Sequence, residues 1–405
     1  MGGTLVNNTK GDRVIWAIVV LLTLISLLVV YSSTGSLAYK HSKSTESYLF
    51  KQFAFIILGV LIIYFAHRVN YTIYSRVAII LFLVSVPLLL YTLLFGVKLN
   101  AGSRWINLPV INMTFQTSDL AKLALFMYMS RQLSRKQNVI KDFRKGFLPI
   151  VIPVIIICLL IAPANLSTAV LIAGTSFLLM FIGRVSTKHI LITLALAAIP
   201  AVILIGVAIK YYDPVEKKSK DLPAIFASGR IPTWISRIQT FKYSNKEDDN
   251  EKLYQINQAK IAIAKGGWLG RGPGRSEQRN FLPHSYSDFI YAIILEEYGF
   301  IGGAFMIFIY LLFLYRCIRV YRKCPYAFGA FLALALSFTL VIQAFSNMGV
   351  NVGAFPNTGV TLPLVSMGGS SFLFTCLSIG IILSVARNVE QSEGQVVAQS
   401  EVANN

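Results

Sequence analysis

Residues 77–96 read VAIILFLVSVPLLLYTLLFG, and no charged side chain interrupts the run. A transmembrane helix needs roughly 20 mostly apolar residues. The run is apolar nearly all round, as a lipid-facing or buried helix requires. A membrane β-barrel would instead show alternating segments of about ten residues. The stretch therefore predicts a helix that crosses a membrane.

The same pattern recurs along the whole chain. Nine further apolar runs lie near residues 14–32, 50–67, 118–133, 147–163, 167–183, 189–209, 288–315, 327–347 and 369–386. Pro163 and Asn165 mark a turn between two of them. The ten runs together predict an all-α polytopic membrane protein with about ten transmembrane helices.

The composition supports this prediction and excludes other classes. The chain has 405 residues, of which 55% are hydrophobic and 14% charged, and its mean hydropathy is +0.63. An ordinary soluble domain carries about 25% charged residues. A soluble protein this apolar could not cover its surface with polar groups, so a soluble enzyme, a disordered chain and a disulfide scaffold are excluded.

The positive charge is explained by topology. The net charge is +19, which could indicate nucleic-acid binding. Lysine and arginine accumulate, however, in cytoplasmic loops of membrane proteins. Alternate short loops carry the basic residues: Arg68 and Arg76; Arg131, Arg135, Lys136, Lys141, Arg144 and Lys145; Arg184 and Lys188; Arg316, Arg319, Arg322 and Lys323. With Lys10, Arg13 and Arg387, they place both termini in the cytoplasm, and we expect no nucleic-acid partner.

One connection is far longer than the others. Residues 210–287 form a large extracytoplasmic loop between the seventh and eighth predicted helices. Within it, residues 231–241 and 253–264 have apolar residues at helical spacing and predict short helices at the membrane surface. The glycine-rich stretch 265–274 predicts an irregular loop. We expect residues 1–389 to form one transmembrane domain and residues 390–405 a disordered cytoplasmic tail.

Ionisable residues at membrane depth are functional candidates by default. Asp119 and Lys122 lie three residues apart, hence on one helix face, and we interpret them as a structural ion pair. Glu296 and Glu297 lie about two turns into the eighth predicted helix, where each needs a partner or a polar cavity.

Asp288 lies where the long loop meets the eighth helix. A carboxylate there can cap the helix, or it can deprotonate a sugar hydroxyl near the membrane surface. Cations of the loop could hold an anionic phosphate; they are Arg237, Lys242, Lys260, Lys265, Arg271, Arg275 and Arg279. His41 and His284 have no cluster of metal ligands around them in the sequence.

Four stretches of the chain resemble a known family. They are residues 282–302 (LPHSYSDFIYAIILEEYGFIG), residues 355–371 (FPNTGVTLPLVSMGGSS), residues 102–106 with 115–122 (GSRWI and FQTSDLAK), and Tyr254-Gln255 with residues 264–267 (AKGG). In order and spacing they resemble the SEDS proteins FtsW, RodA and SpoVE, with the FtsW branch the better match. The resemblance covers nearly the whole chain.

The resemblance implies a peptidoglycan glycosyltransferase that polymerises lipid II on the outer face of the bacterial cytoplasmic membrane, at the division septum. It implies a class B penicillin-binding protein and other divisome membrane proteins as partners, and a divalent cation (Mg or Mn) with unknown ligands. The family's catalytic aspartate falls on Asp288, and the acidic residue and lysine of its fourth helix fall on Asp119 and Lys122.

The chain departs from the family pattern at three places. His284 stands where the family usually has glutamate, Asp119 stands where it usually has glutamate, and the usual proline–aspartate–glycine turn reads Ala164-Asn165-Leu166-Ser167. The first departure puts any accessory role of that glutamate in doubt. The other two preserve charge or turn chemistry.

The resulting hypothesis assigns Asp288 as general base, with Arg104, Arg237 and Lys265 binding the substrate. Two other functions remain open. A lipid II flippase would need a polar path through the membrane, for which Asp119, Lys122, Glu296 and Glu297 are the best support. A non-catalytic division scaffold would need only the fold and its partner surfaces.

Overall fold

The structure is a computed structural model of the chain. It describes residues 11–34, 45–99, 102–108, 113–213, 218–219, 223, 226, 230–243, 251–282, 285–356 and 358–403. His41 and His284 lie outside these residues.

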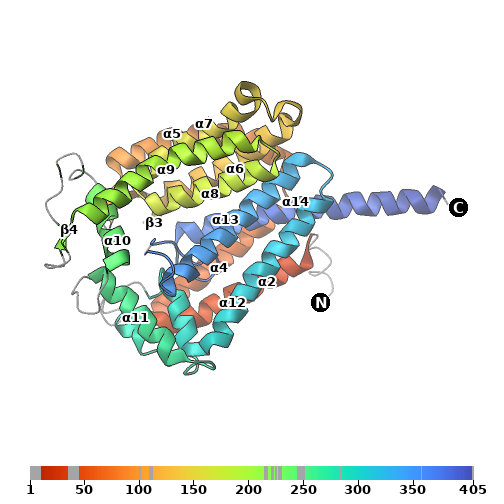
Figure 1. Ribbon diagram of the computed structural model, residues 1–405. Helices are drawn as coiled ribbons and strands as arrows, with labels where there is room; N and C mark the ends of the chain where they lie inside the picture. Colours follow the sequence, from red (N-terminus) through yellow and green to blue (C-terminus); the bar gives the residue numbers. More distant parts are fainter. Residues whose placement is uncertain are drawn as a thin grey trace.

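Each of the ten apolar runs is a helix, which confirms the predicted fold class. The helices are α2 (Arg13–Ser33), α4 (Thr45–Arg68), α5 (Tyr71–Phe95), α6 (Thr117–Arg135), α7 (Leu148–Ile161), α8 (Leu166–Ile182), α9 (Thr187–Lys210), α12 (Ile290–Lys323), α13 (Ala327–Asn351) and α14 (Ser370–Ala403). Eight of them are long and apolar enough to cross a membrane, α7 only together with the turn Phe143–Phe147 that precedes it; α8 is shorter, and α6 carries several charges. Figure 1 shows them as one bundle of roughly aligned helices.

Polar side chains set several helix boundaries. Asp12 Oδ1 accepts the N–H groups of Val14 and Ile15 at the start of α2. Asn70 and Asn165 cap α5 and α8 in the same way. The cap at Asn165 agrees with the turn predicted there.

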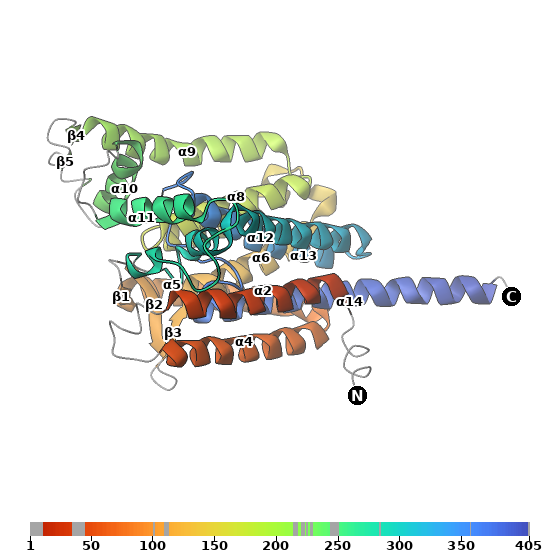
Figure 2. The same cartoon turned by 90° about the horizontal axis from the view of Figure 1, so that it is seen from below.

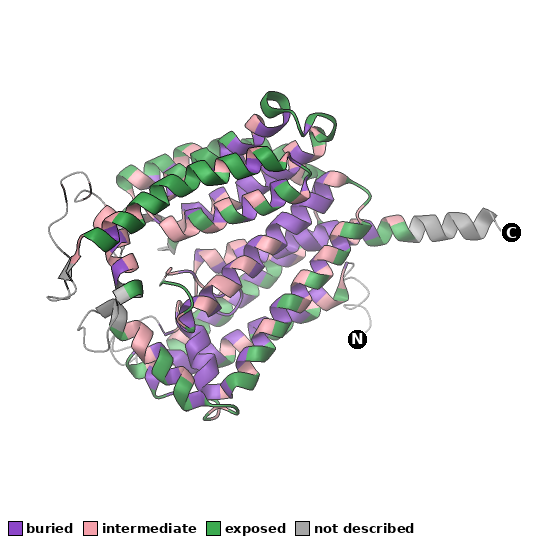
Figure 3. Ribbon diagram, in the orientation of Figure 1, coloured by how far each residue is buried: buried purple, intermediate pink, exposed green. Residues whose placement is uncertain are grey.

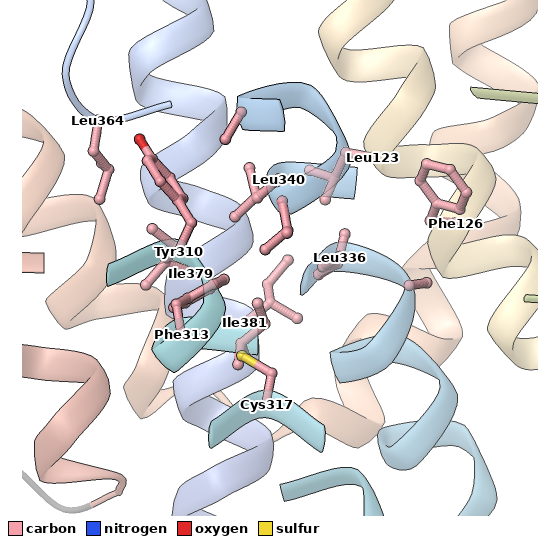
Figure 4. Close-up of a cluster of buried hydrophobic side chains, with 14 of the residues drawn as sticks. Leu123, Phe126, Tyr310, Phe313, Cys317, Leu336, Leu340, Leu364, Ile379 and Ile381 are labelled. Atoms are coloured by element: carbon pink, nitrogen blue, oxygen red, sulfur yellow. The ribbon is translucent and has the colours of Figure 1, made fainter. Parts of the chain in front are cut away.

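Helix α13 lies at the centre of the bundle, and α9 lies at its edge. In the most apolar stretch of α13, 83% of the residues are buried, whereas in that of α9 only 6% are. Figure 3 shows the same contrast. In Figure 4, side chains of α6, α12, α13 and α14 meet around Leu336 and Leu340. Because the side chains of α9 are apolar but exposed, they face the lipid expected around the bundle.

The long loop and the strands lie at one end of the bundle. Figures 1 and 2 place α10 (Ile231–Tyr243) and α11 (Glu251–Gly266) at the end opposite the start of α2 and the projecting end of α14. Both predicted loop helices are therefore confirmed as helices. That the first end is extracytoplasmic stays a prediction.

A small antiparallel sheet was not predicted. Its strands, β1 (Val97–Leu99), β2 (Gly102–Leu108) and β3 (Met113–Gln116), connect α5 to α6 in the order β1-β2-β3. The hairpin β4 (Tyr212–Asp213) with β5 (Lys218–Ser219) follows α9. Strands of two to seven residues carry too little alternation to be recognised among long apolar helices.

Two boundaries differ from the prediction. Helix α14 continues to Ala403, where we expected a disordered tail from Glu390. Helix α12 contains Gly299 at φ 66°, a left-handed conformation that bends the helix and suits glycine. The remaining short helical turns are η1 (Gln137–Val139), η2 (Phe143–Phe147) and η3 (Gln278–Asn280).

Candidate active site

Asp288 lies immediately before α12 and is fixed through its main chain. Its carbonyl oxygen accepts hydrogen bonds from Asn347 Nδ2 and Asn351 Nδ2, each at 2.9 Å. Both asparagines are buried in α13. The carbonyl of the preceding Ser287 accepts from Ser366 Oγ at 2.6 Å. The backbone that carries Asp288 is therefore held from two sides.

Asn351, not Asp288, caps the first turn of α12, although the sequence had left a capping role open for Asp288. Phe289 occupies the N-cap position of α12. The N–H of Ala292, in the first turn, donates to Asn351 Oδ1 at 3.0 Å. A side chain from α13 thus satisfies a donor that a local cap would normally take.

Three arginines lie close to one another, and two of them, Arg104 and Arg237, interact electrostatically with Asp288. Arg104 is on β2, Arg230 directly precedes α10, and Arg237 is in α10. Arg104 Nε donates to the carbonyl of Ala164 at 3.0 Å, and Arg230 Nη1 donates to the same oxygen. The turn between α7 and α8 therefore binds two guanidinium groups together.

The charges of this cluster act on one another. Burial and the nearby Arg230 and Arg237 lower the pKa of Arg104 to about 10, and the Asp288 carboxylate partly opposes this shift. Burial and Arg230 likewise lower the pKa of Arg237, again against the effect of Asp288. Three cations and one carboxylate leave the cluster with an excess of positive charge, which an anion would neutralise.

A glycine leaves space between Asp288 and Arg104. A Cβ atom placed on Gly359 would lie 3.6 Å from Asp288 Oδ2 and 3.9 Å from Arg104 Nη1. Gly359 has φ +64°, so a side chain there would also be strained. Both charged groups therefore face the same small residue.

The predicted Asp119–Lys122 pair is formed. Lys122 Nζ lies 3.3 Å from Asp119 Oδ1 and donates to Gln343 Oε1 at 3.1 Å. Gln343 Nε2 in turn donates to the Thr361 carbonyl at 3.1 Å, two residues from Gly359. The pair thus supports the segment that faces Asp288, while its role as a purely structural pair stays a prediction.

Lys265 lies apart from the arginine cluster. Its Nζ is 2.7 Å from Glu277 Oε2, and Arg271 Nη2 is 2.7 Å from Glu277 Oε1. These two cations hold the pKa of Glu277 down at about 2. Lys265 therefore pairs within the loop, and the geometry does not support its predicted place in a substrate site.

Glu296 and Glu297 hold the long loop against α12. Both are almost fully buried. Glu296 accepts from Ser276 Oγ and from the N–H groups of Glu277 and Gln278, and Glu297 accepts from Ser32 Oγ. The loop N–H groups of Arg271 and Gly272 also donate to the carbonyls of these two glutamates. Donors from the loop therefore engage both carboxylate oxygens of Glu296. Of Glu297, Oε1 accepts hydrogen bonds, whereas Oε2 is buried without a partner.

Sequence reasoning missed three residues of this site: Arg230, Asn347 and Asn351. Arg230 lies in a charge-rich loop where nothing local distinguishes it. The asparagines did carry a signal, because two amides four residues apart on an apolar helix share one face. Only ionisable residues at membrane depth had been considered.

The donor set does not fit a divalent cation held by the protein alone. Within the described residues, no group of three His, Cys, Asp or Glu side chains lies close enough to hold a metal ion. Among the described residues, Arg104 and Arg237 are charged neighbours of Asp288, and their positive charges repel a cation.

Comparisons with known proteins agree with this architecture. Residues 12–391 match the sequence model of the FTSW_RODA_SPOVE family, described as cell cycle protein. A probable peptidoglycan glycosyltransferase FtsW of Trichlorobacter lovleyi is 32% identical over 383 residues, covering 94% of each chain. The stage V sporulation protein E of Bacillus subtilis is 31% identical over 386 residues, covering 94% of this chain and 98% of the relative.

Solved structures share the fold. A chain of a peptidoglycan synthase complex, studied for the structural coordination of polymerization and crosslinking, superposes with a TM-score of 0.72 at 22% identity, over 94% of this chain and 99% of that one. The rod shape determining protein RodA of Thermus thermophilus gives a TM-score of 0.65 at 20% identity, over 93% and 97%. With the family match spanning nearly every described helix, the chain belongs to the FtsW/RodA/SpoVE family of integral membrane proteins.

Proposed function

We propose that the chain is a peptidoglycan glycosyltransferase that polymerises lipid II into glycan strands for septal wall synthesis. The observation that carries the proposal is one carboxylate, Asp288, that interacts with Arg104 and Arg237 of a three-arginine cluster at the end of a membrane bundle. Lipid II offers groups that match both parts: a sugar hydroxyl to be deprotonated and a diphosphate to be stabilised. The FtsW relatives named above are called probable peptidoglycan glycosyltransferases, which supports the same activity.

In the proposed reaction Asp288 accepts the proton of the acceptor sugar hydroxyl. The hydroxyl oxygen forms a bond to the anomeric carbon of the donor. The bond from that carbon to the diphosphate oxygen breaks, and undecaprenyl diphosphate leaves with the electron pair. The proton ends on Asp288, and the growing negative charge lies on the leaving diphosphate.

Arg104, Arg230 and Arg237 would stabilise that leaving group. Guanidinium groups bind phosphate oxygens in pairs, and fixed charges in a partly buried site act strongly on developing charge. Arg104 and Arg230 are oriented by the Ala164 carbonyl before any substrate binds. The site would therefore need little rearrangement to accept the diphosphate.

We further propose the cellular setting from the resemblance and the charge pattern. The chain would lie in the bacterial cytoplasmic membrane at the septum, with both termini in the cytoplasm and Asp288 facing out. A class B penicillin-binding protein and other divisome membrane proteins would be its partners. The divalent cation implied by the resemblance remains a prediction, testable by adding a chelator to the polymerisation assay.

The test is polymerisation of lipid II by the purified protein, with lipid scrambling measured in parallel. Glycan strands that disappear in Asp288→Asn support the enzyme. Scrambling without polymer would indicate a flippase, and neither activity, with a purified class B penicillin-binding protein supplied, would indicate a scaffold. The contacts of Glu296, which engage both of its carboxylate oxygens within the loop, favour the enzyme over the flippase.

A further inference from the structure

A second cationic region lies at the opposite end of the bundle from Asp288. It is a pocket of about 760 Å³ between the starts of α5 and α13, the end of α6 and the middle of α14. Asp288 precedes the first residue of α12, whereas Tyr326 and Ala327 of the pocket follow its last turn. The pocket therefore cannot belong to the proposed active site.

Three arginines line this pocket, which we call the α5–α13 pocket. They are Arg76, Arg131 and Arg135. Arg131 and Arg135 are four residues apart on α6, so their like charges lie one helical turn from each other. Arg131 Nη1 donates to the carbonyl oxygen and, at 3.4 Å, to the hydroxyl of Ser75, both uncharged acceptors.

The carboxylates at this end of the bundle are engaged elsewhere. Asp12 pairs with Arg316 at 2.6 Å, and Glu393 pairs with Lys323 at 2.7 Å. Glu390 accepts the N–H of Gly11 at 2.8 Å. Over the described ranges, no carboxylate lines the α5–α13 pocket and none forms an ion pair with its arginines. Three arginines therefore lack a counter-charge.

The other lining groups suit an anion with several oxygen atoms. Hydroxyl and amide side chains line the pocket around the arginines: Thr72, Ser75, Ser134, Asn388, Gln391 and Ser392. The first residues of α13, which has no side-chain cap, also line the pocket and add the partial positive charge of a helix N-terminus, whereas the start of α5 is capped by Asn70. A phosphate group matches this combination of guanidinium and hydroxyl donors.

The adjoining surface of α5 indicates a lipid as the source of the phosphate. Ile80 and Leu83 lie four and seven residues after Arg76, on the same helix face. Ile80 is 64% exposed and Leu83 is 62% exposed. A headgroup in the pocket would place its acyl chains along this apolar face, which a free phosphate would leave uncovered. Basic pockets between helices at the cytoplasmic side are a recognised form of anionic-lipid site.

We propose that the α5–α13 pocket binds the phosphate-bearing headgroup of an anionic phospholipid, with the acyl chains lying along α5. The arginines hold the phosphate, and the hydroxyl and amide groups hold its remaining oxygens or the headgroup polar atoms. This inference does not rest on the proposed polymerase activity, because it uses other residues at the other end of the bundle.

The test compares lipid binding by the wild-type chain and the double variant Arg76→Gln/Arg135→Gln. Both side chains are exposed, so the fold should survive their loss. The full chain is placed in phosphatidylcholine nanodiscs with a minority of phosphatidylglycerol, and retained lipid is counted by native mass spectrometry. Because charge-assisted hydrogen bonds are lost, binding of phosphatidylglycerol should weaken about tenfold.

The matched control is Arg319→Gln/Arg322→Gln, which removes the same charge from exposed positions at the same end of the bundle, outside the pocket. It should retain phosphatidylglycerol within about twofold of the wild type. Melting temperatures in phosphatidylcholine alone verify that both variants fold. If both double variants lost phosphatidylglycerol binding equally, the effect would be one of overall charge, and the proposed site would be refuted.

Inorganic phosphate separates the two sources of the anion. Added to wild-type protein in phosphatidylcholine nanodiscs, it should give no thermal stabilisation at concentrations where phosphatidylglycerol gives a clear one. Equal stabilisation by phosphate, lost in Arg76→Gln/Arg135→Gln, would make the pocket a site for a soluble anion and refute the lipid assignment.

Discussion

Asp288 and the pair Glu296–Glu297 lie within ten residues of each other at the start of α12, yet their surroundings differ in kind. Asp288 is partly exposed and interacts with the guanidinium groups of Arg104 and Arg237. The two glutamates are buried and accept hydrogen bonds from hydroxyl and N–H donors of the loop and α2, with one oxygen of Glu297 left without a partner. The same functional group can thus serve chemistry in one place and hold a loop in the other, depending on whether it is partly exposed or is buried against hydrogen-bond donors of the loop.

The largest effect is expected for Asp288→Asn, which removes the base but keeps the side-chain shape. A positioned base contributes about 10² to 10⁴ in rate, so polymerisation of lipid II should fall by at least about 10². The melting temperature should barely change, because Asn351 caps the first turn of α12 and asparagine is itself a good cap. Polymerisation within about threefold of wild type by a well-folded variant would remove Asp288 from the mechanism.

Glu296→Ala should show the opposite signature. It leaves the donors of Ser276, Glu277 and Gln278 buried without an acceptor, at about 1–3 kcal/mol each. The expected result is a lower melting temperature and increased proteolysis of the loop between α11 and α12. Glu46→Ala, an exposed change in the first turn of α4, is the control and should melt nearly like the wild type. Unchanged stability with lost polymerisation would contradict the structural role and move Glu296 towards the chemistry.

Asn351→Leu sharpens the comparison by disturbing Asp288 without removing it. The change deletes a donor to the Asp288 carbonyl and the acceptor for Ala292. Because misplacement of about 1 Å can reduce a rate about 10²-fold, we expect kcat to fall about tenfold or more with KM nearly constant. Asn351→Gln, which retains an amide, should recover part of the loss. A rise in KM alone would argue against a positioning role.

Arg230→Gln tests whether the cations near Asp288 bind an anion. Loss of one of three guanidinium groups should reduce kcat/KM for lipid II about tenfold. The salt dependence of kcat/KM should become shallower, because one fewer charge attracts the diphosphate. The informative control is Arg230→Lys, which keeps the charge but loses the paired donors. Its kcat/KM should lie between those of the wild type and Arg230→Gln. Normal kcat/KM in Arg230→Gln would exclude this arginine from the substrate site.

The smallest effect is expected at Lys265 and Glu277, the ion pair in the loop. Since the pKa of folded Glu277 lies at about 2, below its ordinary value of 4.5, its contribution to stability is complete above pH 4.5 and is lost as pH falls towards 2. Lys265→Ala should leave polymerisation at neutral pH nearly unchanged, because exposed pairs contribute little. A large loss of polymerisation would restore Lys265 as a substrate-binding residue. Glu277→Gln should flatten any pH dependence of loop proteolysis in the acid range.

The sequence by itself determined the spans, the two loop helices and the position of Asp288 at the start of a helix. Hydropathy and helical period are properties of neighbouring residues, so they can be read along the chain. The Asp119–Lys122 contact belongs to the same class, because a spacing of three residues fixes it within one helix turn.

The tertiary structure alone decided which cations surround Asp288. Arg104 and Arg230 share the Ala164 carbonyl across separations of 60 and 66 residues, and Asn351 reaches Ala292 across 59. Lys265 was as good a candidate as Arg237 in the sequence, yet it pairs with Glu277 inside its own loop. The physical reason is that a charge has no preferred partner along the chain: its neighbours depend on how the helices pack, and packing is set by apolar surfaces that carry no information about which arginine faces which carboxylate.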